Sequence, residues 1–312
     1  MSNIEVSGFK FLSSDGMTDI DALKWIPEGE IRGCVQIAHG VAEHKERYDG
    51  FARFLADNGF AVYANDHLGH GKSIKDESCL GFFSEEDGWK KVVSDVEKLR
   101  TIAADENPDV PYFLFGHSMG SFVMRSYLIM YPDAPVKGAV ICGTGQTGGM
   151  VVNIGLSICK GEIKKVGVKG KSEKLDNLAF GGYGKKFEPC RTKFDWLSKN
   201  EENVDKYLED PSSGFLCTTG LFRDMMSGIK FIGDTKNIAG MNKDVPVYLI
   251  AGGDDPVGDF GKGVAKVEAL MKKAGVKDVE KKIYEGYRHE ILNEDIKEDV
   301  MNDILRWIEK RM

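Results

Sequence analysis

Short apolar segments rich in Val, Ile, Tyr and Phe recur along the chain and are bounded by Gly and Pro. Polar residues scarcely interrupt them, which is typical of parallel strands that are buried on both faces. They predict strands at Cys34–Ala38, Ala61–Asn65, Tyr112–Gly116, Ala139–Cys142 and Val247–Ala251.

Two segments near the start of the sequence, Phe9–Ser13 and Ala22–Ile26, alternate between apolar and polar residues. Alternation indicates strands with one buried face, and we expect them to form an antiparallel edge. Segments with helical periodicity separate the strands, at Lys45–Asn58, Glu85–Asp105, Met119–Met130, Asp259–Ala274 and Asp295–Lys310. This repeated order of strand and helix predicts an α/β fold, with a mostly parallel open sheet flanked by helices.

The alternation stops between about Thr144 and Ile238. This stretch contains scattered Gly and Lys, an apolar piece at Met150–Cys159 and a helix-like piece at Thr192–Asn200, but no clear strand. A segment of this length inside a strand–helix array predicts an inserted subdomain or a long lid. We therefore expect residues 1–143 and 239–312 to form the core and residues 144–238 to form an inserted cap.

Composition excludes several classes of function. The 312 residues carry a formal net charge of −7 and no long basic run, which argues against nucleic-acid binding. The start of the sequence does not resemble a signal peptide, and no segment approaches the roughly 18–20 apolar residues of a membrane-spanning helix. Six scattered cysteines form no C-x-x-C pair. We expect a cytoplasmic protein with reduced thiols.

The strongest chemical signal is Gly116-His117-Ser118-Met119-Gly120, which follows a predicted strand and precedes a predicted helix. This is the setting of a nucleophile elbow, in which a strained turn presents a serine hydroxyl and small neighbours let the backbones approach. The alternative is a glycine-flanked serine that merely caps a helix. His39-Gly40 ends another predicted strand, so we expect the backbone N–H groups of Val41 and Met119 to form an oxyanion hole. The alternative there is an ordinary turn.

An acid and a base are expected from the last two strand ends. Asp254 and Asp255 follow the strand Val247–Ala251, and either could orient a histidine, although turn chemistry alone explains one of them. His289 follows a further predicted strand, Lys281–Tyr284. It completes the chain order Ser, Asp, His.

These motifs resemble those of the monoacylglycerol lipase and lysophospholipase-like branch of the α/β-hydrolases, which is grouped with the serine aminopeptidase S33 enzymes. The resemblance rests on His39-Gly40-Val41-Ala42-Glu43-His44, on Asp66-His67-Leu68-Gly69-His70-Gly71 and on the elbow. It implies the α/β-hydrolase fold, a catalytic triad of Ser118, Asp255 and His289, and a cap over the active site. The family's G-x-x-D pattern selects Asp255.

Other polar residues near the motifs are expected to support the site. Glu43, His44 and Arg47 are predicted to form a network that braces the oxyanion loop. His39, Gly40 and His117 are predicted to support the site or its loops. His67 and His70 lack the further ligands that would complete a metal site. Gly143-Thr144-Gly145-Gln146-Thr147-Gly148 matches a dinucleotide pattern but does not open a βαβ unit. We expect neither a metal nor a cofactor.

The sequence therefore predicts a serine esterase that acts on a small acyl ester or lipid, such as a monoacylglycerol or a lysophospholipid. An aminopeptidase or amidase is the first alternative, and its substrate amine would need an acidic residue of the cap (Glu162, Glu173, Asp176 or Glu188). A non-catalytic binding protein on the same fold is the second. The sequence leaves the oligomeric state open.

The apolar piece Met150–Cys159 is followed by a group of lysines. This pattern suggests that Val151, Ile154 and Ile158 line an acyl channel and that the lysines attract an anionic head group or membrane surface. The alternative is a cap helix packed on the core, with its lysines in solvent.

Overall fold

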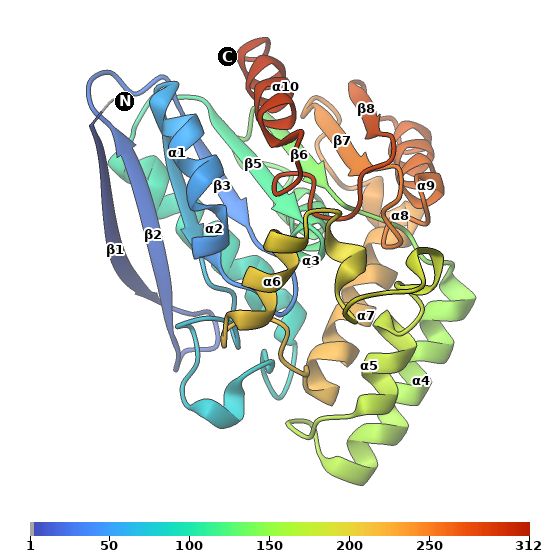
Figure 1. Cartoon of the computed structure of the whole chain (residues 1–312). Helices are drawn as coiled ribbons and strands as arrows, with labels where there is room; N and C mark the ends of the chain where they lie inside the picture. The colour runs from blue at the N-terminus through green and yellow to red at the C-terminus, as the bar shows by residue number, and fades with distance from the viewer. Residues whose placement is uncertain (1–2) are drawn as a thin grey trace.

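The computed structural model describes residues 3–312 and contains one eight-stranded sheet (Figure 1). Its strands are β1 (Ile4–Leu12), β2 (Asp19–Pro27), β3 (Gly33–Ala38), β4 (Phe60–Asn65), β5 (Tyr112–His117), β6 (Gly138–Cys142), β7 (Val247–Gly252) and β8 (Val279–Tyr284). They lie in the order β1-β2-β4-β3-β5-β6-β7-β8. From β4 to β8 neighbouring strands are parallel, whereas β2 pairs antiparallel with both β1 and β4. This is the α/β-hydrolase architecture that the sequence predicts.

The five apolar strands occur where the pattern places them, and every residue of β3 to β7 is buried. The prediction for the first strand places its start too late. It was expected at Phe9–Ser13, whereas β1 spans Ile4–Leu12 because β2 supplies partners along its whole length, from Ile4 opposite Pro27 to Leu12 opposite Asp19. The two strands form the antiparallel edge that their alternating pattern indicates.

Helices cover both faces of the sheet. On one face lie α1 (Asp49–Asp57) and α10 (Lys297–Glu309), whose buried residues Leu55 and Ile304 belong to the same apolar cluster. The larger cluster on the other face includes residues of α2 (Gly88–Glu106), α3 (Met119–Met130) and α9 (Lys262–Lys273). The sheet is thus enclosed between two helical layers.

The segment from residue 144 to 238 contains helices and irregular loops and contributes no strand to the sheet. Its helices are α4 (Gly149–Val166), α5 (Glu173–Phe180), α6 (Glu201–Glu209), α7 (Thr219–Gly233) and α8 (Thr235–Ile238). Helix α7 packs on both α3 and α4, and in Figure 1 α4 and α5 project beyond the sheet. Among residues 3–312, no helix has the length and hydrophobicity that crossing a membrane requires.

The prediction of a helix at Thr192–Asn200 is wrong. That stretch contains only a 3-10 turn at Asp195–Leu197. The Asp195 carboxylate accepts hydrogen bonds from the backbone N–H groups of Arg191 and Thr192, and such local side-chain bonds compete with helix formation. The true helix, α6, begins one residue after the predicted end, where the Asn200 side chain accepts from the Asn203 N–H.

Candidate active site

Ser118 lies in a tight turn between β5 and α3. Its backbone has φ 53° and ψ −121°, a conformation that a residue with a side chain adopts only when the surrounding structure imposes it. A Cβ atom on Gly116 would lie 2.4 Å from the Gly120 carbonyl oxygen, and one on Gly120 would lie 2.1 Å from the Ala38 carbonyl oxygen. Only glycine allows this close packing of strand, turn and helix, which holds the serine at the end of the sheet.

Two backbone N–H groups lie beside Ser118. The loop after β3 approaches so closely that a Cβ on Gly40 would be 3.1 Å from the Ser118 Cβ, and Val41 follows directly. Met119 is the first residue of α3, whose leading N–H groups have no partner inside the helix. Within the described residues the N–H groups of Val41 and Met119 donate to no protein acceptor, and both residues line the same cavity as Ser118. They are therefore free to bind a developing oxyanion.

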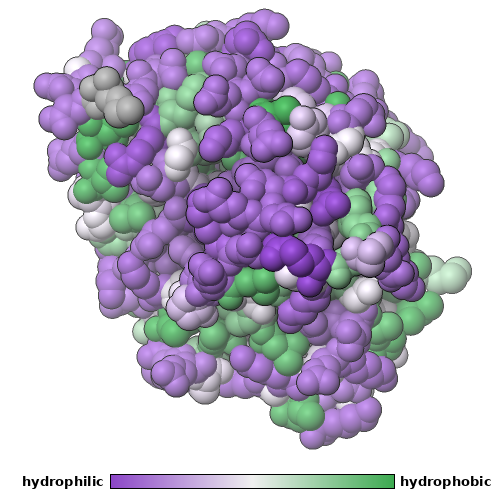
Figure 2. Space-filling view, viewed as in Figure 1, coloured by the Kyte–Doolittle hydropathy of each residue, from purple (hydrophilic) through white to green (hydrophobic). Residues whose placement is uncertain are grey.

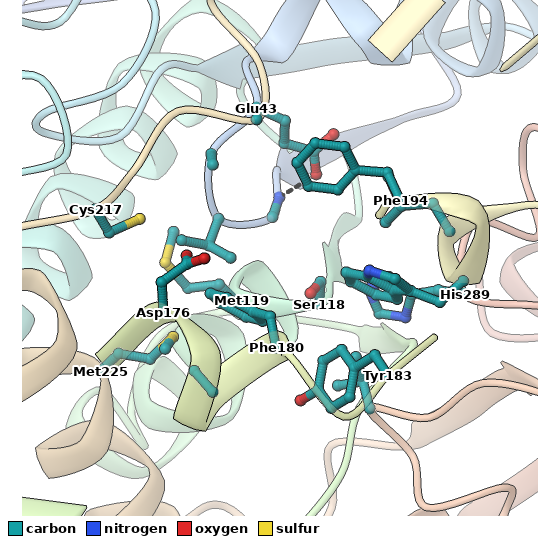
Figure 3. Close-up of a pocket in the computed structure, with 18 of the residues that line it drawn as sticks. Glu43, Ser118, Met119, Asp176, Phe180, Tyr183, Phe194, Cys217, Met225 and His289 are labelled. Carbon is teal, nitrogen blue, oxygen red and sulfur yellow. Dashed lines mark hydrogen bonds between the residues drawn. The ribbon is translucent and has the colours of Figure 1, made fainter. Parts of the chain in front are cut away.

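Asp255 and His289 come from the ends of the adjacent parallel strands β7 and β8. His289 Nδ1 lies 2.9 Å from Asp255 Oδ2, and both side chains are buried. The other carboxylate oxygen, Oδ1, accepts a hydrogen bond from the Val257 N–H at 2.8 Å, which fixes the carboxylate. Figure 3 shows the His289 ring next to Ser118 at one end of the cavity.

Two opposing effects set the pKa of His289. Burial alone would lower it, because an imidazolium loses its hydration in the interior. The adjacent Asp255 carboxylate outweighs burial, with smaller contributions from Glu290 and Glu43, so the pKa of His289 lies above its ordinary value of 6.5. The neighbouring Asp254 is engaged elsewhere, since its Oδ1 accepts a hydrogen bond from Lys186 Nζ at 2.5 Å. The geometry thus pairs the histidine with Asp255.

A buried charged network connects the Gly40 loop to the His289 loop. Glu43 Oε1 accepts hydrogen bonds from the Gly40 N–H at 2.5 Å and from the Tyr48 hydroxyl at 2.8 Å. Arg47 Nη1 donates to Glu43 Oε2 at 2.6 Å and to Glu290 Oε1 at 2.7 Å, while Nη2 donates to Glu290 Oε2 at 2.8 Å. Burial opposes ionisation of Glu290, but Arg47 outweighs it and lowers the pKa of that carboxyl to about 2. One arginine therefore binds two buried carboxylates.

The histidines near the site have different partners. His39 Nδ1 donates to the Gly40 carbonyl oxygen at 2.7 Å and its Nε2 accepts from the His67 N–H at 2.9 Å, so this ring supports the loop. The His117 ring centre is 4.5 Å from that of His289, and burial lowers the pKa of His117 to about 4. The prediction that His44 joins the network of Glu43 and Arg47 is wrong, because His44 Nε2 pairs with Asp210 Oδ2 at 2.6 Å.

A cavity of about 340 Å³ extends from Ser118 (Figure 3). Most of its large apolar lining residues belong to the segment 144–238, namely Val151, Leu178, Phe180, Tyr183, Phe194, Trp196, Leu197, Tyr207, Phe215, Leu216, Met225, Met226 and Ile229. Among the four acidic residues considered as amine ligands, Asp176 alone lines the cavity. Glu162, for example, pairs with Lys165 at 2.7 Å and with Lys174 at 3.7 Å.

The predicted channel lining on α4 is wrong for two of its three residues. Val151 lines the cavity, but Ile154 is 56% exposed and Ile158 packs against the core instead. The buried positions of α4 include Val152 and Cys159, seven residues apart, so its buried stripe runs along a different side of the helix. The apolar pattern of Met150–Cys159 predicts a helix but not which of its residues face the cavity.

A family model described as serine aminopeptidase, S33, matches residues 29–296. The chain belongs to this family. The monoacylglycerol lipase of Mycolicibacterium smegmatis is 29% identical over 286 residues, which cover 91% of this chain and 90% of the lipase. The human monoglyceride lipase is 28% identical over 295 residues, covering 92% and 86% of the two chains. A solved structure of a thermostable carboxyl esterase from Bacillus coagulans is 30% identical, with a TM-score of 0.92 and 99% of each chain covered.

These relatives identify the S33 chain as a hydrolase of the ester-cleaving kind. Several residues that build its site are not predicted from the sequence. The Trp196 ring centre is 5.2 Å from that of His289, the Tyr207 hydroxyl donates to the Ala42 carbonyl oxygen at 3.0 Å, and Asn203 Nδ2 donates to Glu290 Oε2 at 2.7 Å. All three come from the segment 144–238, where no sequence motif marks them as site residues.

Proposed function

We propose that this S33 hydrolase cleaves carboxylic esters through an acyl-enzyme on Ser118, with His289 as the base and Asp255 as its orienting carboxylate. The observation that carries the proposal is the arrangement of three groups. Ser118 sits in a strained turn beside a buried histidine, and that histidine's Nδ1 lies 2.9 Å from Asp255 Oδ2. Its other ring nitrogen, Nε2, is left to exchange a proton with the serine.

Acylation begins when Ser118 Oγ attacks the carbonyl carbon of the ester and gives its proton to His289 Nε2. The carbonyl oxygen gains the negative charge and accepts hydrogen bonds from the N–H groups of Val41 and Met119. Asp255 stabilises the imidazolium that has formed. When the carbonyl re-forms, the bond to the alcohol oxygen breaks, and His289 returns the proton to the leaving alcohol.

Deacylation repeats these steps with water. His289 takes a proton from a water molecule, whose oxygen attacks the acyl carbon of the Ser118 ester. The same two N–H groups bind the second oxyanion. The bond to Ser118 Oγ then breaks, the serine regains its proton from His289, and the carboxylic acid leaves.

We further propose that residues 144–238 act as a cap that binds the acyl chain. Support comes from the apolar cavity walls that this segment supplies, and from the names of the relatives, which include a monoacylglycerol lipase and a monoglyceride lipase. A buried methylene contributes about 0.8 kcal/mol, so such walls favour esters of long acyl chains over acetate esters. The substrate class we favour is a monoacylglycerol or lysophospholipid-like ester.

The outer face of this cap suits transient contact with a lipid surface. Exposed apolar side chains lie on α4 and α5, at Met150, Val151, Ile154 and Leu178; of these, Val151 and Leu178 also line the cavity. Figure 2 shows hydrophobic side chains across the lower half of the molecule, and some of them lie at the lower right among hydrophilic ones, where Figure 1 places α4 and α5. Lysines 160, 164, 165, 169, 171 and 174 flank them, and such residues attract anionic head groups.

Sedimentation with vesicles should show more binding when anionic lipid is present, and equal binding with neutral vesicles would contradict this role.

The decisive experiment labels the purified protein with a fluorophosphonate and measures its activity on a panel of esters and aminoacyl anilides. Wild type should be labelled and should cleave the esters, whereas Ser118→Ala should lose labelling and about 10⁴- to 10⁶-fold in kcat. Ser227→Ala, an exposed serine of α7, is the matched control and should behave as wild type. Ester turnover by Ser118→Ala within tenfold of wild type would remove the serine mechanism. A preference for anilides would favour the amidase alternative.

A further inference from the structure

The cavity beside Ser118 contains a carboxylate that the proposed mechanism does not use. Asp176 lies on α5, and Figure 3 shows its side chain pointing into the cavity, on the opposite side of Ser118 from His289. Phe180, Met119 and Met225 line the cavity around it. Among the residues that the structure describes, none donates a hydrogen bond to the Asp176 carboxylate or forms an ion pair with it.

The neighbouring charged groups do not neutralise Asp176. Lys193 also lines the cavity, but it is exposed, and its ammonium lies 4.7 Å from the centre of the Phe194 ring. Burial raises the pKa of the Asp176 carboxyl; Lys193 opposes this effect and Glu173 adds to it. Burial likewise raises the pKa of the Cys217 thiol to about 12, with Asp176 contributing, so that thiol stays neutral and adds no charge beside Asp176.

An isolated carboxylate in an apolar wall affects what the cavity accepts. An ionised carboxylate is an acceptor only, and it forms its strongest hydrogen bonds with hydroxyl or ammonium donors. A methyl group packed against it removes water without replacing the lost hydrogen bonds, and a second carboxylate placed nearby is repelled. The same group therefore attracts one class of substrate and rejects another, which is how binding sites create specificity.

We propose that Asp176 is a specificity-determining residue that makes this cavity favour esters whose part remote from the scissile bond carries a hydrogen-bond donor, and disfavour esters that end in a carboxylate. This inference rests on the proposed esterase function. Asp176 does not contact the reacting atoms, so its effect is on the choice between substrates rather than on the chemical step. Hydroxyl and ammonium groups share the donor chemistry, and the experiment separates them.

The test uses p-nitrophenyl esters of acyl chains from about four to ten carbons, each made with a terminal methyl, hydroxyl, ammonium or carboxylate group. The readout is the ratio of kcat/KM between esters of equal length that differ only in the terminal group, so any general loss of activity cancels. For wild type at the preferred length, we expect the ammonium ester to exceed the carboxylate ester by about tenfold or more. A hydroxyl ester that also exceeds the methyl ester would assign the donor preference to neutral substrates as well.

Three variants decide the origin of that ratio. Asp176→Asn should reduce the ammonium-to-carboxylate ratio by about tenfold, and Asp176→Lys should invert it. Glu173→Gln removes one negative charge from an exposed position of the same helix that does not line the cavity, and should keep the wild-type ratio. A ratio that stays within twofold of wild type in both Asp176 variants overturns the inference while leaving the esterase function intact. Failure of wild type to cleave any methyl-terminated ester, or full activity of Ser118→Ala, overturns the proposed function itself.

Discussion

Arg47 binds both carboxylate oxygens of Glu290, the residue that directly follows His289, at 2.7 and 2.8 Å. The same guanidinium contacts Glu43, which in turn accepts the Gly40 N–H. One side chain therefore connects the loop that contains Gly40 with the loop that contains His289. All three charged side chains are largely buried, with exposed fractions of 12% for Arg47, 5% for Glu43 and 4% for Glu290. Such a network is sensitive to the loss of any single member.

We predict that Arg47→Met destabilises the protein and lowers activity together. The change leaves Glu43 and Glu290 buried without their cation, which costs about 3–5 kcal/mol in the free energy of unfolding. The His289 loop then loses its support, and kcat/KM on an ester should fall by at least about tenfold, because catalysis depends on geometry within an ångström. Urea unfolding and ester kinetics measure the two effects.

The matched control is Arg53→Met. Arg53 pairs with Asp49 at the surface, where both side chains are 46% exposed. Exposed pairs contribute about 0–1 kcal/mol, so this variant should stay close to wild type in stability and activity. If Arg47→Met proved as stable as Arg53→Met, the buried network would not hold the two loops together.

The adjacent aspartates should respond very differently to removal of their charge. Asp255→Asn is expected to lower kcat by about 10⁴-fold, since an amide cannot stabilise the imidazolium and favours the wrong histidine tautomer. Asp254→Asn should leave kcat within a few-fold of wild type, because it disturbs only a partly exposed pair with Lys186. Both variants are measured on one ester. A larger loss from the Asp254 change would mean that Asp254, and not Asp255, orients His289.

The acid side of the profile of kcat/KM against pH should reflect the titration of His289. The base must be neutral to accept the serine proton, and a raised pKa keeps His289 protonated to a higher pH than usual. We therefore expect kcat/KM to fall about tenfold per pH unit on the acid side, with an apparent pKa above about 6.5. Glu290, with a pKa of about 2, and His117, with a pKa of about 4, titrate below this range. An acid limb centred well below pH 6, on protein shown to be folded there, would contradict the Asp255 effect.

The parts of the site that sequence predicts are those that local physics determines. The elbow is recognisable because glycine is required at positions 116 and 120, where a Cβ atom would lie less than 2.5 Å from a backbone oxygen. A strand and a helix also flank Ser118 directly. The register of the parallel strands then brings Asp255 and His289 together, as the chain order predicts.

The rest depends on contacts between distant residues, which periodicity does not encode. Trp196 and Tyr207 reach the site from a segment of short helices and turns with no repeating pattern. His44 lies next to Glu43 in sequence but pairs with Asp210, 166 positions away. The apolar pattern of α4 predicts a helix, yet packing on α7 decides which side of it is buried.

The last prediction concerns the acyl chain and compares two residues of α4. Val151 lines the cavity, whereas Ile154, one turn further along, does not. Both are largely exposed, at 61% and 56%, so replacing either by serine should change stability by no more than about 0.5 kcal/mol. On a p-nitrophenyl ester series, wild-type kcat/KM should rise with acyl length to about eight carbons, as each buried methylene adds about 0.8 kcal/mol.

Val151→Ser should flatten that rise, lowering kcat/KM for the long esters by about two- to fourfold while leaving acetate unchanged, because it removes apolar surface that only a long chain reaches. Ile154→Ser should keep the wild-type profile on soluble substrates. The comparison is informative because the two changes remove similar amounts of exposed apolar surface and differ in whether that surface faces the cavity. Equal effects from both variants would mean that the outer face of α4, rather than the cavity wall, governs the response to chain length. A wild-type preference for acetate would mean that the apolar walls do not bind the acyl chain at all.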